Sequence, residues 1–287
     1  MPRTARNPLR RPTLKGVQAP LDGVARRNGS AGPLQSVGRA LRVLEVIANS
    51  PDGLTAKQIA AELDLALPTT YHLLHALIDA GHVVHLSDQH VYGLGYMARY
   101  LGQALTRQLA VPPGVAGAIR AVHQDADAAA YYAVYRDTEV VIAHVEDSER
   151  RPRAQPLDVG FHQAAHATAF GKIMLSAMGP QRLARYLDAA GLAALTPATI
   201  SDRGALEDHL AHVRQSHLAL EIGEFQQGMS CMAVPVREPA GGVVASVAIS
   251  LPTDEFLSRR WEVERAVRQG ATRVTRALAV FQRNGQV

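Results

Sequence analysis

Cysteine is almost absent from this chain of 287 residues, which contains only Cys231. A single cysteine can form neither an intrachain disulfide framework nor a thiolate metal cluster, and it fits the reducing cytoplasm. Long apolar runs are also absent, because the most apolar stretch, Val243 to Leu251, is too short to span a bilayer. We therefore expect a cytoplasmic protein without a membrane partner.

Positive charge is scarce outside the N-terminal segment. Residues 1–33 hold seven basic side chains against the single acidic Asp22, whereas the whole chain carries a net charge of only +4. Between Leu34 and Ala110, five arginines and lysines stand against six aspartates and glutamates. This balance is a weak electrostatic footprint for a surface that would bind phosphates.

The first 33 residues also lack aromatic side chains and any apolar period, and they are rich in proline and glycine. Such a segment cannot bury enough apolar surface to offset its chain entropy, so we expect a disordered basic arm. It does not resemble a secretion signal, because no apolar core of adequate length follows the arginines. Its charge suits non-specific contact with phosphates, and a solvated extension without a role is the alternative.

A pair of short, bounded helices precedes Gly81. Thr55 is a suitable cap for the first helix, Ala56 to Leu63, where apolar residues recur at helical spacing. Pro68 is suited to the first turn of the second helix, and Gly81 is suited to the left-handed conformation that often follows the end of a helix. The second helix is therefore predicted from Pro68 to Ala80.

The segments on either side of this pair complete a known unit. Val83-Val84 and Val91-Tyr92 flank a polar stretch and suit the two strands of a wing, and an apolar face within Ser36 to Ala48 closes a three-helix core. Two helices with a glycine stop also occur in many all-helical domains. The wing and the upstream helix favour a winged helix-turn-helix, which enters a DNA groove.

The second helix of such a unit carries the residues that read DNA. Outward side chains near its N-terminus meet the base edges of operator DNA. The candidate DNA contacts are Thr69, Thr70, Tyr71, His72 and His75.

The double proline in Val111-Pro112-Pro113 ends a helical stretch that begins near Leu94. Beyond it, predicted helices and strands alternate along the chain. The predicted strands are Ala128 to Val134, Glu139 to Val145, and a hairpin of Met232 to Arg237 with Val243 to Leu251. The predicted helices are Ala165 to Ala177, Gln181 to Ala189, Ala205 to Ser216, and Glu255 to Phe281. This pattern predicts an α/β (α+β) domain with a mainly antiparallel sheet.

Three segments follow the helix-turn-helix unit and the connecting helix along the chain, namely His166 to Lys172, Leu195 to Ile200, and Gly228 to Val236. Together these motifs resemble those of the IclR family of transcriptional regulators. The resemblance implies a winged helix-turn-helix at 34–93, a linker helix at 94–112 that pairs with a second subunit, and an effector-binding domain with a curved sheet at 113–287. It also implies a homodimer or homotetramer.

The resemblance further implies a ligand site in the C-terminal domain. In members that bind small oxoacids such as glyoxylate, the carboxylate meets backbone amides just before a glycine-lysine pair. The matching amides here are those of Ala169 and Phe170, and the other ligand contacts map onto Glu221, Cys231, Ala248 and Ser250. Phe170 replaces a small residue, Glu221 an aspartate and Ala248 a serine. The bulkier side chain in the site wall and the missing serine hydroxyl imply that the ligand is an organic acid larger or more apolar than glyoxylate. Its carboxylate would lie near the start of a helix, where an anion is favoured.

Other chemistry is less favoured by the motifs. His162 and His166 stand four apart, as metal-binding histidines on a helix do, but the segment between them lacks the glutamate of a zinc peptidase. Gly228 to Met232 begins like a nucleophile elbow, but Met232 takes the place of the second glycine. Lys172 is typical of a solvated or helix-capping lysine. We therefore expect no catalytic residue, metal or cofactor, and a metal-dependent enzyme is the weaker alternative.

His72 supports another alternative, a regulator with weakened DNA binding that acts through protein contacts. Many IclR-family members carry arginine at this position, and a neutral imidazole supplies less charge than a guanidinium.

Overall fold

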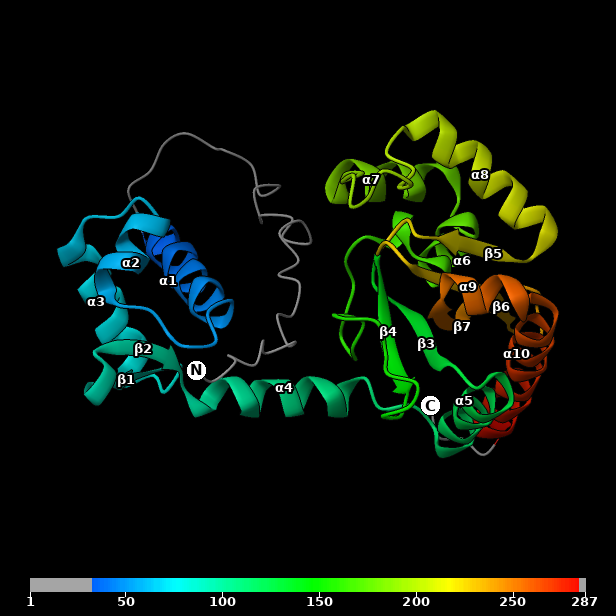
Figure 1. Ribbon diagram of the computed structural model, residues 1–287, viewed down its shortest axis with the longest axis horizontal. Helices are drawn as coiled ribbons and strands as arrows, with labels where there is room; N and C mark the ends of the chain where they lie inside the picture. The colour runs from blue at the N-terminus through cyan, green and yellow to red at the C-terminus, as the bar shows by residue number, and fades with distance from the viewer. Residues whose placement is uncertain (1–32, 284–287) are drawn as a thin grey trace, which may run out of the picture. The chain divides into compact units, whose positions relative to one another are not determined.

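The computed structural model describes residues 33–283, drawn in colour in Figure 1. The chain forms two compact units that adjoin in sequence at Gln108 and Leu109, and each is described by itself. The predicted basic arm at 1–33 lies outside the described residues, except for Pro33, where the first helix begins. None of the described helices is both long enough and apolar enough to cross a membrane.

The N-terminal unit has the predicted order of helices and hairpin. Its elements are α1 (Pro33–Ala48), α2 (Ala56–Glu62), α3 (Leu67–Asp79), β1 (Val83–Leu86), a 3-10 turn η2 (Ser87–Gln89), β2 (Val91–Leu94) and α4 (Tyr96–Gln108). Thr55 caps α2, because its hydroxyl accepts from the amide of Gln58 and the Gln58 side chain accepts from the amide of Thr55. This capping box satisfies two amides near the start of the helix.

The first three helices enclose a small apolar core. Val43, Ile59 and Leu74, one from each helix, are at most 1% exposed. An isolated bridge between Leu54 and Tyr92 ties the hairpin to this core. The unit is the predicted winged helix-turn-helix.

The C-terminal unit is built on a five-stranded sheet with the strand order β4-β3-β7-β6-β5. Its strands are β3 (Ala129–Arg136), β4 (Glu139–Glu146), β5 (Ala219–Ile222), β6 (Met229–Arg237) and β7 (Val243–Pro252). Every pair of neighbouring strands is antiparallel, which confirms the predicted fold class.

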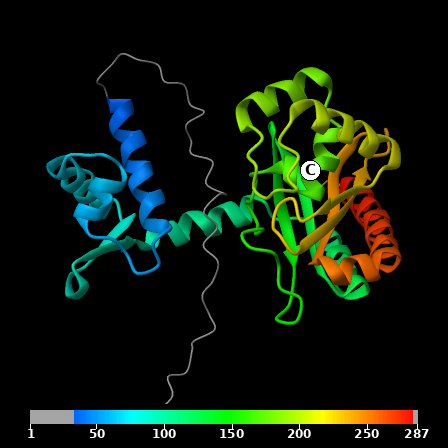
Figure 2. The same ribbon diagram turned by 45° about the horizontal axis from the view of Figure 1, so that its top comes forward.

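Helices cover both faces of this sheet (Figures 1 and 2). They are α5 (Pro113–Ala126), α6 (Ala169–Ser176), α7 (Pro180–Ala190), α8 (Arg203–Ser216), α9 (Thr253–Ser258) and α10 (Arg260–Arg283). Because side chains alternate along a strand, Cys231 and Ala233 belong to the apolar cluster with α6, α7 and α8, whereas Met232 and Val234 pack with α5 and α10.

Two predicted helices are interrupted. The stretch predicted as one helix at 165–177 is a 3-10 turn, η3 (Ala165–Ala167), followed by α6. Thr168 between them is extended, and its hydroxyl caps α6 by accepting from the amide of Gly171. The terminal helix predicted at 255–281 is divided near Arg259 into α9 and α10.

The helix α5 and the strand β5 were not predicted. Pro113, interpreted only as a helix stop, is also the first residue of α5, a position where the missing amide costs nothing. β5 has only four residues, too few for a clear alternating pattern.

Candidate functional site

The outward face of α3 carries most of the predicted DNA contacts. Tyr71 is 43% exposed, His72 and His75 are exposed, and Thr69 is half-buried. All four lie in the first nine residues of the helix, the part that contacts base edges in helix-turn-helix proteins. The N-cap residue Ala66 provides no side-chain acceptor, so the first-turn amides suit contact with phosphate oxygens.

Thr70 does not belong to this face, and its prediction as a DNA contact is corrected here. It is fully buried, and its hydroxyl donates to the carbonyl of Ala66 at 3.3 Å. Leu74 and Leu77 follow it at four and seven residues and are buried on the same side. The helical period therefore directs Thr70 into the core of the domain.

Strand pairing brings three of the predicted effector residues into one row. Cys231 lies opposite Glu221 on one side and opposite Ser250 on the other. Ala248 lies two residues before Ser250, so it is on the same face, opposite Tyr131. Residues that are distant in sequence thus share the sheet face that α6 covers.

The start of α6 packs directly on this face. Phe170 is only 2% exposed, and its ring centroid lies 6.4 Å from that of Tyr131. The Tyr131 hydroxyl lies 2.9 Å from the Ser250 hydroxyl, and the amide of Ala154 donates to Tyr131 at 3.1 Å. The aromatic pair therefore fills space that a smaller residue at position 170 would leave open, and Ala169 is buried beside it.

Glu221 occupies a buried and polar position. Its Oε1 accepts hydrogen bonds from the backbone amides of Glu224 and Phe225. Burial raises the pKa of Glu221 to about 7, although the hydrogen bonds that it accepts favour the charged form and act in the opposite direction. Burial and the nearby Glu221 raise the pKa of the Cys231 thiol, so this cysteine is a poor nucleophile.

Lys172 is buried, contrary to its interpretation as a solvated or capping residue. It has no exposed surface and pairs through Nζ with Glu224 Oε1. Burial lowers the pKa of Lys172, while Glu224 acts in the opposite direction. The second carboxylate oxygen, Glu224 Oε2, is buried and has no partner among the described residues. The sequence offers no signal for this pair, because 52 positions separate its members.

A cavity of about 630 Å³ opens where β7 ends and β6 begins. Ser250 is the only predicted effector residue among those that line it. The loop that follows β4 supplies Arg150, Arg151 and Arg153 to the wall. This loop was not predicted to belong to the site, although the basic run Arg150-Arg151-Pro152-Arg153 is a visible signal in the sequence.

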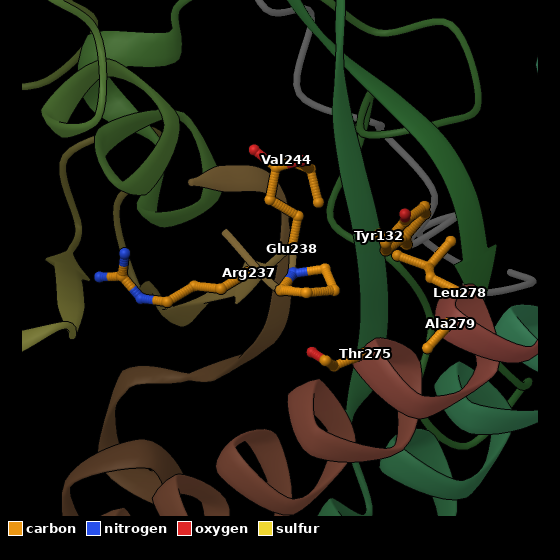
Figure 3. A pocket seen from close by; sticks show the side chains of 8 residues that line it. Tyr132, Arg237, Glu238, Val244, Thr275, Leu278 and Ala279 are labelled. Atoms are coloured by element: carbon orange, nitrogen blue, oxygen red, sulfur yellow. The ribbon is translucent and has the colours of Figure 1, made fainter. Parts of the chain in front are cut away.

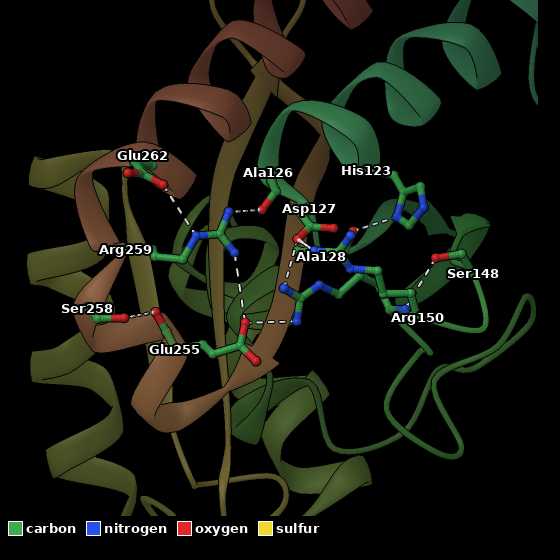
Figure 4. A network of polar contacts seen from close by, with 11 residues as sticks. His123, Ala126, Asp127, Ala128, Ser148, Arg150, Glu255, Ser258, Arg259 and Glu262 are labelled. Carbon is green, nitrogen blue, oxygen red and sulfur yellow. Dashed lines mark hydrogen bonds and ion pairs between the residues drawn. The ribbon is translucent and has the colours of Figure 1, made fainter.

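Ion pairs connect this loop to neighbouring helices. Asp127, at the end of α5, accepts from both Arg150 and Arg151, and hydrogen bonding to Arg151 is the main cause that lowers the pKa of Asp127. Arg151 also pairs with Glu255 of α9 at 2.8 Å. Figure 4 shows Asp127 and Glu255 together with Arg259, which donates to the carbonyl of Ala126.

A second, smaller cavity of about 170 Å³ lies between the β6–β7 hairpin and α10. Figure 3 shows Tyr132, Thr275 and Leu278 around it, with Arg237 and Glu238. Its volume is below the usual range of small-molecule sites, about 300–1,000 Å³.

The histidine pair of the sequence analysis does not form a helical metal motif. His162 precedes η3 and contacts the carbonyl of Gly160, whereas His166 is buried and contacts the carbonyl of Ala193 at 3.0 Å. Within residues 33–283, no three histidine, cysteine, aspartate or glutamate side chains are grouped so that they could hold a metal ion.

A winged helix-turn-helix followed by a separate α/β domain is the architecture of a DNA-binding regulator with a sensory domain. The model of the IclR helix-turn-helix domain matches residues 36–87, and that of the bacterial transcriptional regulator IclR C-terminal domain matches residues 114–276. The chain therefore belongs to the IclR family. It is a DNA-binding transcriptional regulator with a C-terminal effector-binding domain.

Similar proteins include transcriptional regulators from other bacteria. The chain is 29% identical over 223 residues to the HTH-type transcriptional regulator BhcR of Paracoccus denitrificans, covering 78% of this chain and 79% of BhcR. It is 27% identical to XynR of Escherichia coli, covering 77% of this chain and 87% of XynR.

Solved structures show the same fold. Thermotoga maritima IclR has a TM-score of 0.65 at 22% identity, covering 85% of this chain and 99% of that one. An IclR homologue from Microbacterium hydrocarbonoxydans, complexed with 4-hydroxybenzoate, has a TM-score of 0.64 at 22% identity, with coverage of 85% and 99%.

Proposed function

We propose that this regulator reads its operator with the outward residues of α3, namely Thr69, Tyr71, His72 and His75. The supporting observation is that Tyr71, His72 and His75 are exposed while Leu74 between them is buried. A helix with this polarity can lie in the major groove with its polar face on the base edges and its apolar face on its own core.

The test is binding of the full chain to DNA fragments from upstream of its own gene, in the presence of excess mixed-sequence competitor. Retention of one fragment against the competitor supports operator reading. Equal affinity for every fragment would instead favour the regulator with weakened DNA binding, which acts through protein contacts.

We further propose that the effector is an organic acid with an apolar body. The cavity of about 630 Å³ carries this proposal, because it is far larger than glyoxylate needs. The 4-hydroxybenzoate bound to the related structure is an acid of this class. Ser250 would contact the ligand directly, as it lines the cavity.

The other five predicted effector residues do not line the cavity and would influence ligand binding from positions beneath its surface. Ala169, Phe170, Glu221, Cys231 and Ala248 are each at most 5% exposed. We propose that they shape the inner end of the site and that a ligand reaches them only when Phe170 moves.

A thermal-shift screen of the full chain tests the effector proposal, because a ligand that binds only the folded state raises the melting temperature. The panel contains glyoxylate and a set of larger aliphatic and aromatic carboxylic acids. Stabilisation by larger acids supports the proposal, and stabilisation by glyoxylate alone contradicts it.

We also propose a cytoplasmic homodimer or homotetramer without catalytic activity, in which α4 is the linker helix that pairs with a second subunit. α4 contains no buried residue, and Tyr96, Tyr100 and Leu101 are more than half exposed on it. Contiguous exposed apolar side chains mark an interaction surface. Light scattering of the wild type and of Leu101→Glu tests this, since the variant should have the smaller mass.

A further inference from the structure

All charged side chains that line the cavity beside Ser250 are cationic. Three arginines contribute to its lining, and no aspartate or glutamate does. Met229, Leu251 and Pro252 add apolar surface. This combination suits an anionic group attached to an apolar body.

The three arginines are not equivalent. Each guanidinium nitrogen of Arg153 already has an acceptor, because Nε and Nη2 donate to Asp147 and Nη1 donates to Asp158. The Arg150 side chain is 79% exposed and makes one hydrogen bond to Asp127, at 3.2 Å. Neither residue combines a fixed position with a buried guanidinium nitrogen that has no acceptor.

Arg151 has both properties. Its side chain is only 16% exposed, and its two terminal nitrogens are fixed by Asp127 and Glu255, each at 2.8 Å. Its Nε is buried and has no hydrogen-bond partner among the described residues. A buried donor without an acceptor costs free energy that a suitable ligand recovers. Arg151 is therefore a positioned cation whose Nε–H has no acceptor among the described residues.

Gln226 provides the complementary group on the same cavity. Its Oε1 is buried and has no partner within residues 33–283. The cavity wall thus contains a buried unpaired donor, on a cation, and a buried unpaired acceptor, on a neutral amide.

We propose that the cavity binds an organic acid that also carries a hydroxyl or amide N–H group, with its carboxylate on Arg151 Nε and its donor group on Gln226 Oε1. This proposal rests on the proposed function, because it assigns the recognition of the organic acid to two residues of that cavity. Recognition of the acid then depends on the loop after β4 and on the loop between β5 and β6, rather than on the start of α6.

The experiment measures binding of three probes to the full chain by isothermal titration calorimetry. The probes are 4-hydroxybenzoate, benzoate without the hydroxyl, and 4-hydroxybenzyl alcohol without the carboxylate. The wild type should bind 4-hydroxybenzoate most tightly, and loss of either group should weaken binding by roughly tenfold or more. Equal binding of all three probes would overturn the proposal.

Variants separate direct recognition from a structural effect. Arg151→Gln should weaken binding of 4-hydroxybenzoate by roughly tenfold to a hundredfold. Arg268→Gln is the control, because it removes an ion-paired and partly exposed arginine of α10 that does not line the cavity, and it should bind within about threefold of the wild type. Asp127→Asn removes an ion pair of Arg151 but keeps its guanidinium, so it should retain binding. Loss of binding in Asp127→Asn equal to that in Arg151→Gln would overturn the direct role of Arg151.

The outcomes also distinguish this proposal from the proposed function. If Arg151→Gln binds 4-hydroxybenzoate as the wild type does, the role of Arg151 is wrong while the organic-acid effector stands. If the wild type binds neither these probes nor any acid of the larger panel, the effector class itself is wrong, and this proposal is wrong with it.

Discussion

Glu221 and Cys231 lie directly opposite each other on β5 and β6, and the Cys231 thiol is within hydrogen-bonding reach of the Glu221 carboxyl group. The carboxyl group is 1% exposed, and its pKa is raised from 4.5 to about 7, with burial as the largest cause. The protonated form is therefore favoured in the folded chain up to neutral pH.

This position predicts a pH dependence of stability. Because the folded pKa of Glu221 exceeds the unfolded value, the folded state binds the proton more tightly between these two values. The stabilising contribution is complete below pH 4.5 and is lost as the pH rises through about 7. The loss amounts to roughly 3 kcal/mol. Urea unfolding at several pH values between 5 and 8 measures it, and Glu221→Gln should remove it.

His209 makes the comparison with Glu221→Gln necessary. Burial lowers the pKa of His209 to about 4, so its contribution to stability is lost as the pH falls below 6.5, opposite in sign to that of Glu221. Only the difference between wild type and Glu221→Gln isolates the carboxyl group. An identical pH profile for both proteins would show that Glu221 is not buried as described.

The ion pair of Lys172 and Glu224 predicts that a single substitution lowers the free energy of unfolding more than the double substitution does. Removing one partner leaves an uncompensated buried charge, so Lys172→Met should lower the free energy of unfolding by about 3–5 kcal/mol. The double variant Lys172→Met, Glu224→Leu removes both charges and should recover most of this loss. Denaturant unfolding of the full chain measures both, and additive losses in the double variant would contradict the pairing.

Local signals allowed much of the fold to be predicted. Thr55 with Gln58 and Pro68 with Gly81 mark helix ends, because capping depends on a few consecutive residues. The break at Thr168 was not predicted, since it accompanies a close approach of Gly171 to Ala165, which depends on packing.

The candidate sites were predicted less completely, for the same reason. Family resemblance alone brought Glu221, Cys231 and Ser250 together, because strand pairing is non-local. The burial of Lys172 depends on a partner 52 positions away. Thr70 is different, because the helical period already placed it on the buried side with Leu74.

Thr70 and His72 should separate the two faces of α3. His72→Ala changes an exposed side chain, so stability should stay within about 0.5 kcal/mol while discrimination between operator and competitor DNA falls by roughly tenfold. Thr70→Val removes a buried hydroxyl that is bonded to Ala66, which should cost about 1 kcal/mol of stability and leave the discrimination ratio unchanged. Competition binding assays and thermal unfolding measure the two effects. The reverse pattern would return Thr70 to the DNA surface.

Gly171 and Gly117 should respond oppositely to the same substitution. A Cβ atom at Gly171 would lie 2.2 Å from the backbone oxygen of Ala165, a contact that no side-chain rotation relieves. Gly171→Ala should therefore cost at least about 2 kcal/mol of stability.

Gly117 is the matched control, because it lies in α5, is exposed, and has no atom within 4 Å of the added Cβ. Gly117→Ala should raise stability by about 0.5–1 kcal/mol, since alanine loses less backbone entropy in a helix. Urea unfolding of both variants gives the comparison. If Gly171→Ala were as stable as Gly117→Ala, η3 and α6 could not approach as closely as described, and the packing of Phe170 beside Tyr131 would need revision.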